Sequence, residues 1–302
     1  MKKIPVGQTI AFAYRFLISE IATIVGLTWI PALIAAVAGY FAQYYGISHS
    51  ALLEAGDTQT GAAYLAITVT SLAVMGFASA VVAVAITRQV LGQRAPGIVV
   101  AYFAAGRSEW RMFGASLRFM AGTTVLLALA AGITAFAFVL AGVPLNTPAQ
   151  AQPTPAALLA GLISWVVFVY AFVTILRMGF LLPPVIVAEE KGGLRRAHDL
   201  TKGNFWRMFA VMLALGLPVL ALLLAGEGVV LRSALGPNIA NLSPAEFMDK
   251  AEQAMNEKLL PWTIFTTVVF ILGSGLVFSG TAFAYRAVAE NSGELPALKR
   301  KQ

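Results

Sequence analysis

Residues 62–87 read AAYLAITVTSLAVMGFASAVVAVAIT, and none of these 26 residues is Asp, Glu, Lys or Arg. As an α-helix with a rise of about 1.5 Å per residue, the stretch would be roughly 39 Å long, which exceeds the roughly 30 Å of a bilayer's hydrocarbon core. Backbone N–H and C=O groups have no water to bind in lipid, so a spanning segment satisfies them internally as a helix. The stretch therefore predicts a transmembrane helix.

Five more runs without charged residues have the same character and are 19 to 27 residues long. They cover residues 21–42, 119–145, 156–176, 208–226 and 259–285. Hydrophobic residues make up 59% of the chain and charged residues only 12%, about half the charge of an ordinary soluble domain. The period-2 alternation of a membrane β-barrel is absent. We predict an all-α integral membrane protein, a single domain over residues 1–302 with six transmembrane helices.

Positive charge is distributed unevenly between the segments that connect these runs. Of the 21 Lys and Arg, 18 lie in the N-terminal tail, the second and fourth connections and the C-terminal tail, and only Arg232, Lys250 and Lys258 lie elsewhere. Loops rich in Lys and Arg stay in the cytoplasm. We therefore expect a multi-pass protein of a bacterial inner (plasma) membrane with both termini cytoplasmic. Nucleic-acid binding is not expected, because the cations are spread over short loops beside the bilayer.

The tetrapeptide WRMF occurs twice, at residues 110–113 and 206–209. Each copy follows a glycine, Gly106 or Gly203, that is predicted to end a short helix in a left-handed conformation. A weaker third copy, TIAFAYRF, occupies residues 9–16. Each copy thus predicts a short helix at the cytoplasmic interface, directly ahead of a transmembrane helix.

Two further features recur with these copies. The transmembrane helices that follow them are predicted to begin at the capping residues Ser19, Ser108 and Asn204. The second, fourth and sixth runs end with a lone arginine, namely Arg88, Arg177 and Arg286. Together these features predict three internal repeats, each a cytoplasmic interfacial helix followed by a helical hairpin. The repeats cover about 9–91, 98–182 and 195–289.

Basic and aromatic residues beside the membrane are candidates for lipid contact. A snorkelling cation and an amphipathic indole both fit the interface, and each Lys or Arg near an anionic surface contributes on the order of 1 kcal/mol. The candidate interface residues are Arg195, Arg196, Lys202, Trp206, Arg207, Trp110, Arg111, Arg88, Arg177 and Arg286. Among them, Arg195, Arg196, Lys202 and Arg207 are predicted to anchor the chain to anionic headgroups. For Arg177, simple snorkelling is the favoured interpretation and a specific lipid or protein contact the alternative.

No pattern of catalytic or ligand-binding residues is present in the sequence. The two histidines, His49 and His198, have no second ligand at metal-binding spacing, so neither a metal nor a cofactor is expected. Phosphate-binding loops and the G-x-S-x-G and H-E-x-x-H motifs are missing, and no enzymatic activity is expected. Charges deep in the runs, which pumps and coupled transporters use, are also missing. Small and hydroxylated residues in the runs are interpreted as helix contacts, above all in residues 75–80 and 273–280.

Two stretches outside the repeats give local predictions. Pro183 and Pro184 are expected to end the fourth transmembrane helix and to lay the next apolar residues along the inner interface. On the opposite side of the membrane, Ser243, Pro244 and Glu246 form a capping-box pattern. This pattern predicts an amphipathic helix over about 244–259 that lies on the membrane or caps the bundle.

Residues 183–215, PPVIVAEEKGGLRRAHDLTKGNFWRMFAVMLAL, carry a family resemblance. The stretch resembles the hallmark segment of the membrane domain of some glycerophosphodiester phosphodiesterases, and is similar to the YciC-type bacterial inner-membrane proteins. His198 and Asp199 stand where Ser and Trp or Glu are frequent in that pattern. The resemblance implies six spans and an inner-membrane location. It implies no activity, because the phosphodiesterase chemistry belongs to a separate soluble domain that we expect these 302 residues to lack.

Two functions from different classes remain open on sequence grounds. The favoured one is a non-enzymatic inner-membrane protein that contacts anionic lipid through its basic interfacial helices and serves envelope or lipid homeostasis. The alternative is a passive transporter or channel for a small or lipidic solute, and an intramembrane enzyme comes third. A continuous cavity lined by deep polar side chains would favour the transporter, whereas a closed apolar bundle would favour the first function.

Overall fold

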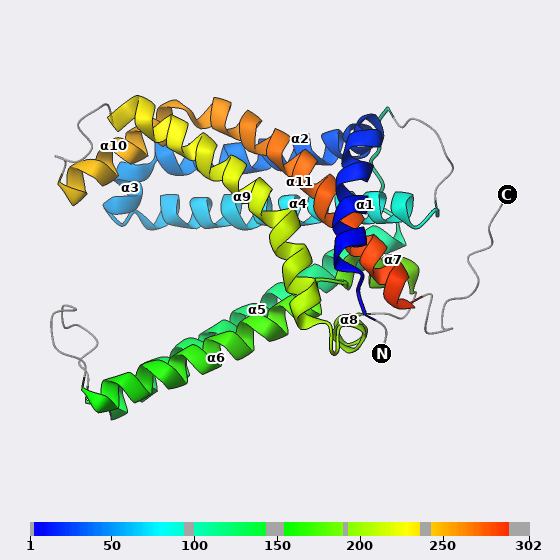
Figure 1. Cartoon of the computed structure of the whole chain (residues 1–302). Helices are drawn as coiled ribbons and strands as arrows, with labels where there is room; N and C mark the ends of the chain where they lie inside the picture. Colours follow the sequence, from blue (N-terminus) through cyan, green and yellow to red (C-terminus); the bar gives the residue numbers. More distant parts are fainter. Residues whose placement is uncertain (1–2, 94–99, 143–153, 190–192, 236–242, 290–302) are drawn as a thin grey trace.

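The computed structural model describes residues 3–93, 100–142, 154–189, 193–235 and 243–289, and their regular secondary structure is entirely helical. Figure 1 shows the helices in chain order. They are α1 (Val6–Ser19), α2 (Ile21–Ser48), α3 (Ser50–Glu54), α4 (Thr58–Val90), α5 (Arg107–Leu140), α6 (Pro155–Gly179), α7 (Leu182–Ala188), α8 (Leu194–Leu200), α9 (Phe205–Leu235), α10 (Pro244–Glu257) and α11 (Leu259–Ala289).

Six of these helices are long and apolar enough to cross a membrane, namely α2, α4, α5, α6 with α7, α9 and α11. Each contains most of one predicted run, so the all-α membrane fold with six spanning helices is confirmed. The charge-free run over 119–145 extends past its helix, because α5 ends at Leu140 and a left-handed Gly142 follows it. Residues 143–145 lie outside the described part of the chain.

The long helices pack in sequential pairs. Helix α2 lies along α4, α5 along α6 and α9 along α11, and α11 also contacts α1, α2 and α4. Figure 1 shows α5 and α6 diverging as a pair from the other long helices. We call this pair the α5–α6 arm. In the most apolar windows of α5 and α6, only 6% and 17% of the residues are buried, against 50% in α4.

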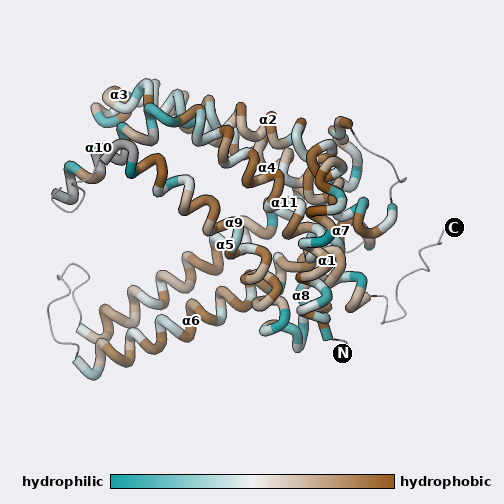
Figure 2. Tube along the Cα trace, turned by 45° about the horizontal axis from the view of Figure 1, so that its top comes forward, coloured by the Kyte–Doolittle hydropathy of each residue, from teal (hydrophilic) through white to brown (hydrophobic). Residues whose placement is uncertain are grey.

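The tightest packing lies at the end of the molecule that carries the N-terminus. Here α1, α7 and α8 meet the adjoining ends of α4, α5, α9 and α11, and we call this region the base (Figure 1). Its core includes Leu181, Met208, Leu215 and Tyr285, all of which are at most 1% exposed. Residues 80–87 of α4 are also buried on all sides, as expected of a helix that is hydrophobic around its whole circumference. Figure 2 shows hydrophilic residues around α8 in the base and around α3 at the far end, with mostly hydrophobic helices between them.

Glycines allow α11 to approach its neighbours closely. A Cβ built on Gly275 would lie 3.0 Å from Ile24 of α2, and a Cβ on Gly280 would overlap Leu215 of α9. On the other predicted face, a Cβ on Gly76 of α4 would lie 3.2 Å from Phe113 of α5. The predicted packing faces at 273–280 and 75–80 are confirmed, because small residues at these positions permit the helix contacts.

The apolar segment after α6 differs from its prediction. The chain leaves α6 at Gly179 and forms the short helix α7, with Pro183 and Pro184 in its first turn, where a missing N–H costs no helical hydrogen bond. Residues 182–186 are buried, and α7 packs against α4, α5 and α11. The prediction of a helix end was right, but the placement along the membrane interface was wrong, because α7 fills the centre of the base.

A helix is present in two of the three places where an interfacial helix was predicted, and the location of these helices at a membrane interface stays a prediction. Helices α1 and α8 precede α2 and α9, and Gly203 after α8 has the predicted positive φ of 72°. Residues 100–106, ahead of α5, contain no helix, and Gly106 has a φ of −83°. In place of helical hydrogen bonds, a side chain of α2 contacts this segment: Trp29 Nε1 donates a hydrogen bond to the Val100 carbonyl at 2.9 Å. The second predicted repeat begins at about residue 98, and residues 98–99 lie outside the described residues.

The three predicted capping residues have different outcomes. Ser19 is the last residue of α1, and Glu20 precedes α2 without a side-chain cap, so that prediction was wrong. Ser108 lies inside the first turn of α5, after the capping residue Gly106. Asn204 directly precedes α9 as predicted.

The predicted outer helix is present as α10. Ser243 Oγ accepts the Glu246 N–H, and the Glu246 carboxylate accepts the Ser243 N–H, which is the predicted capping box. Helix α10 packs against α9 and α11 at the end opposite the base. The internal triplication stays a prediction, although α4, α6 and α11 each carry the expected arginine in their last turn.

Candidate functional site

Glu189, at the end of α7, joins three other helices of the base. Arg196 of α8 donates from Nε to both carboxylate oxygens of Glu189, at 3.2 and 3.0 Å. The Tyr285 hydroxyl of α11 donates to Oε1 of the same carboxylate at 3.0 Å, and Arg111 of α5 donates to the Glu189 carbonyl at 3.1 Å. Because α5, α8 and α11 all bind one residue, Glu189 fixes their relative positions.

A second carboxylate, Glu109, is buried between α4 and α5 with only 1% of its side chain exposed. Arg88, in the last turn of α4, donates to Glu109 at 3.0 Å and to the Ser108 hydroxyl at 2.8 Å. The Tyr102 hydroxyl donates to the same carboxylate oxygen at 3.1 Å. Glu109 also lies in the first turn of α5, where the helix dipole favours negative charge. These contacts offset the cost of burying the ion.

Arg177, in the last turn of α6, connects that helix to α8. Its guanidinium donates to the His198 carbonyl at 3.3 Å, and the Thr201 hydroxyl donates to the Arg177 carbonyl at 3.2 Å. Burial lowers the pKa of His198, and the positive charge of Arg177 lowers it further. His198 is therefore held toward its neutral form, and Arg177 has a defined intramolecular contact in addition to any snorkelling.

The start of the chain is fastened to the start of α9. The Ile4 N–H donates to the Asn204 side-chain oxygen at 3.0 Å, and Arg207 donates to the Ile4 carbonyl at 2.9 Å. We refer to these contacts, together with those of Glu109, Glu189 and Arg177, as the polar layer of the base. The polar layer links Ile4, ahead of α1, with α4, α5, α6, α7, α8, α9 and α11.

The structure separates the predicted interface residues into two groups. Those that bind other residues of the base are Arg88, Arg111, Arg177, Arg196 and Arg207. Those at the surface are Trp110, Trp206, Arg195 and Lys202. Trp110 is 56% exposed and Trp206 is 75% exposed. Lys202 pairs with Asp199 at 3.2 Å, and this contact lowers the pKa of Asp199. Arg286 is half-buried in the last turn of α11.

Sequence reasoning missed the acceptors of this layer. Glu109 is the only acidic residue between Arg88 and Arg118, and this local exception was the available signal. Glu189 gave a weaker signal, because Glu190 and Asp199 are acidic residues of the same segment. Tyr102 and Tyr285 carried no signal, because nothing in their sequence surroundings shows that a carboxylate lies opposite them. The anchor formed by Arg195, Arg196, Lys202 and Arg207 stays a prediction, although Arg196, Lys202 and Arg207 already have partners within the base.

The chemistry of the polar layer is that of ion pairing and anion contact. Among the residues that the structure describes, no three His, Asp or Glu side chains come together as metal ligands. The side chains of Arg88 and Arg196 remain 33% and 32% exposed although both are paired. A planar guanidinium with five N–H donors can bind one carboxylate and still face an anionic oxygen. The layer can thus present positive charge at the surface of the base.

Comparisons with protein-family models, with curated proteins and with solved structures found no match to this chain. The site is therefore interpreted from its own geometry.

Proposed function

We propose that the protein is a non-enzymatic protein of a bacterial inner membrane that binds anionic lipid headgroups with its cytoplasmic base and serves envelope or lipid homeostasis. The observation that carries this proposal is the pairing of exposed indoles with exposed cations on the base. Trp206 is 75% exposed, and it follows the exposed Lys202 by four residues. Indoles prefer the depth of the lipid headgroups, and cations at that depth meet anionic phosphates. The proposal includes the resemblance of residues 183–215 to the YciC-type inner-membrane proteins as part of its basis.

The polar layer supports this proposal by giving the base a fixed shape. Arg196 is paired with Glu189, and Arg88 with Glu109, so both side chains are already ordered before a lipid headgroup binds. Binding therefore costs them little further conformational entropy. Arg195 is exposed, and its charge lowers the pKa of the neighbouring Asp199 carboxylate. We assign direct headgroup contact to Arg195 and Lys202, with Trp110 and Trp206 setting the depth of the base.

The alternative function, a passive transporter or channel, has less support from the packing. The two cavities beside α2 and α11 reach toward the base as far as Ala32, Leu33 and Phe270. Closer to the base, residues 80–87 of α4 are no more than 2% exposed, so packed side chains close the end of this bundle. A path through the described helices would require these side chains to separate.

Binding to vesicles tests the proposal. Purified protein carrying Arg195→Gln and Lys202→Gln should bind vesicles with anionic phosphatidylglycerol roughly thirtyfold more weakly than the unmodified protein, since each of the two cations contributes on the order of 1 kcal/mol near such a surface. Binding to zwitterionic phosphatidylcholine should stay the same. Arg196 is left intact, because its loss would also break the contact with Glu189.

The matched control removes two exposed cations from the opposite end, with Arg232→Gln and Lys250→Gln. The control has the same change in net charge, so it should lose much less affinity if the base is the lipid-binding surface. Equal losses in the two variants, or equal losses in anionic and zwitterionic vesicles, would contradict the proposal.

A further inference from the structure

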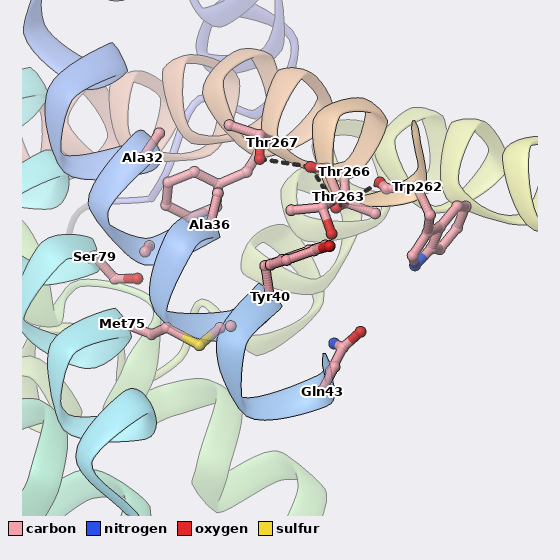
Figure 3. A pocket seen from close by; sticks show the side chains of 13 residues that line it. Ala32, Ala36, Tyr40, Gln43, Met75, Ser79, Trp262, Thr263, Thr266 and Thr267 are labelled. Atoms are coloured by element: carbon pink, nitrogen blue, oxygen red, sulfur yellow. Dashed lines mark hydrogen bonds between the residues drawn. The ribbon is translucent and has the colours of Figure 1, made fainter. Parts of the chain in front are cut away.

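The helices α2 and α11 line two adjoining open cavities at the end away from the base. They pack closely at Ile24 and Gly275, and beyond this contact they leave room between them. A cavity of about 220 Å³ lies among α2, α4 and α11, and we call it the three-helix cavity (Figure 3). A cavity of about 310 Å³ is lined by α2 and α11 alone, and we call it the two-helix groove. Both lie along helices that are apolar enough to span a membrane.

The two cavities share a wall and differ in polarity. Ala36, Tyr40, Thr263 and Thr267 line both of them. The rest of the two-helix groove consists of hydrocarbon side chains, such as Leu33, Val37, Phe41, Ile264 and Val268. The three-helix cavity adds polar groups, since Gln43, Ser79, Trp262 and Thr266 also line it. An apolar groove therefore joins a more polar cavity through a common wall.

The threonines of α11 offer acceptors to the cavity. Their hydroxyl hydrogens already bind their own helix, with Thr263 donating to the Leu259 carbonyl at 2.8 Å and Thr266 to the Trp262 carbonyl at 2.9 Å. Thr267 donates to the Thr263 carbonyl at 2.6 Å. Each hydroxyl oxygen keeps a lone pair that can accept a further hydrogen bond. A ligand that carries O–H or N–H donors would satisfy these oxygens.

The lack of charged lining residues narrows the chemical class of the ligand further. No Asp, Glu, Lys or Arg is among the residues that line the three-helix cavity or the two-helix groove. An ionised headgroup placed here would have no partner for its charge, which is costly in a membrane environment. The occupant that fits is an uncharged molecule with one long apolar part and one hydroxylated part.

We propose that α2, α4 and α11 form a binding site for an uncharged lipid with a hydroxyl-bearing headgroup. One acyl chain lies in the two-helix groove along Leu33, Val37 and Val268, and the hydroxyl group lies in the three-helix cavity against Thr263, Thr266 and Thr267. This site goes beyond the proposed function, because it lies at the other end of the helices from the base and selects against charge. The two proposals can therefore fail independently.

Quenching of Trp262 by brominated lipid tests the site. The probe is a diacylglycerol with dibrominated acyl chains, titrated at a few mole per cent into phosphatidylcholine nanodiscs that contain the protein with Trp29, Trp110, Trp165 and Trp206 replaced by Phe. Bound probe should quench the remaining Trp262 in a saturable way. Phosphatidylcholine with the same brominated chains should quench weakly and without saturation, because its charged headgroup does not fit the cavity.

Two threonine variants measure the role of the hydroxyl oxygens. Thr263→Val with Thr267→Val keeps the side-chain volume and removes two acceptors, so half-saturation should need roughly thirtyfold more diacylglycerol, given about 1 kcal/mol for each hydrogen bond. The matched control is Thr174→Val in α6, which removes a hydroxyl with the same hydrogen bond to the carbonyl four residues earlier, Tyr170, but away from both cavities. The control should shift half-saturation by less than about twofold, since no acceptor of the site is lost.

Several outcomes would overturn the proposal. These are quenching by diacylglycerol that does not saturate, equal quenching by both brominated lipids, and equal shifts in the threonine variant and its control. Native mass spectrometry of the protein with all five tryptophans provides a second readout that does not depend on the tryptophan replacements. It should show one retained dioleoylglycerol in preference to dioleoylphosphatidylcholine, and retention of both lipids to the same extent would contradict the site.

Discussion

At the scale of single residues, Glu109 and Lys202 show how much the charged side chains of the base differ in burial. The Glu109 side chain is 1% exposed, and Arg88 is its cationic partner at 3.0 Å. The Lys202–Asp199 pair has side chains that are 53% and 45% exposed. Water screens an exposed pair and leaves a buried pair strong, while a buried ion that loses its partner remains unsolvated. The pair of Glu109 therefore stabilises the fold, whereas the screened pair of Lys202 contributes little to stability and leaves the lysine at the surface.

The stability of single variants should reflect this difference. Arg88→Gln should lower the free energy of unfolding by about 3 kcal/mol or more, because it leaves the Glu109 carboxylate buried without a cation. Lys202→Gln should change it little. Unfolding in detergent, followed by loss of helical circular dichroism, measures both. Adding Glu109→Gln to Arg88→Gln should restore part of the lost free energy of unfolding, because the unpaired buried charge is then removed. Equal stability of the Arg88 and Lys202 single variants would show that the Glu109 pair is not structural.

His198 provides a pH-dependent test at the same scale. Burial and the charge of Arg177 lower its pKa in the folded protein, so protonation disfavours the fold. The stability contributed by neutral His198 should be fully present above the ordinary histidine pKa of about 6.5, and should be lost as the pH falls through that value toward the lower folded pKa.

Arg177→Gln should raise the His198 pKa toward its ordinary value, because one of the causes that lower it is removed, whereas Arg177→Lys should leave it low. Nuclear magnetic resonance of the histidine Cε1 signals measures the pKa, and the chain has only two histidines, so His49→Gln assigns the peaks. A His198 pKa that stays the same or falls in Arg177→Gln would mean that the Arg177 charge does not act on this ring.

At the scale of helices, the positions of the spans could be predicted and their packing largely could not. Charge-free runs located all six long helices, because burial in lipid constrains composition over the whole length of a span. Residues 273–280 also revealed a packing face, since close helix approach requires small side chains. The prediction failed for residues 100–106 and for α7. Their conformations depend on distant contacts, such as the hydrogen bond from Trp29 to Val100 and the packing of α7 inside the base.

The same limit applies to the candidate site. Its cations were predicted, because topology concentrates Lys and Arg in cytoplasmic segments. Their partners were not, because Arg111, Arg196 and Tyr285 meet Glu189 only after α5, α8 and α11 have packed together. A pattern within one segment carries no information about such contacts between segments.

Two glycines test the packing of the helices. A Cβ at Gly280 of α11 would overlap Leu215 of α9, so Gly280→Ala should destabilise the protein by about 1–3 kcal/mol through overpacking. Gly132 of α5 has open space around its Cα, and Gly132→Ala should be neutral or stabilising by up to about 1 kcal/mol through helix propensity. Thermal unfolding in detergent compares the two variants. A Gly280→Ala protein as stable as Gly132→Ala would mean that α9 and α11 do not approach as closely as described.

At the scale of the whole molecule, the structure combines a tightly packed base with helices that separate toward the far end. The α5–α6 arm diverges from the other long helices (Figure 1), and its outward residues, including Leu162, Trp165 and Phe136, are exposed and apolar. Apolar surface of this kind is stable in lipid and costly in water. The arrangement agrees with a base at the cytoplasmic interface and arms embedded in the bilayer, which is the orientation that the proposed function requires.

The orientation of the base is the central claim, and cysteine labelling in spheroplasts tests it most directly. The chain contains no cysteine, so single substitutions give no background. With a membrane-impermeant maleimide, Glu54→Cys, Ala149→Cys and Lys250→Cys should react in intact spheroplasts. Arg15→Cys and Lys202→Cys in the base should react only after the membrane is permeabilised. Labelling of Lys202→Cys in intact spheroplasts, or protection of any one of the three outer positions, would contradict the six-span topology with a cytoplasmic base.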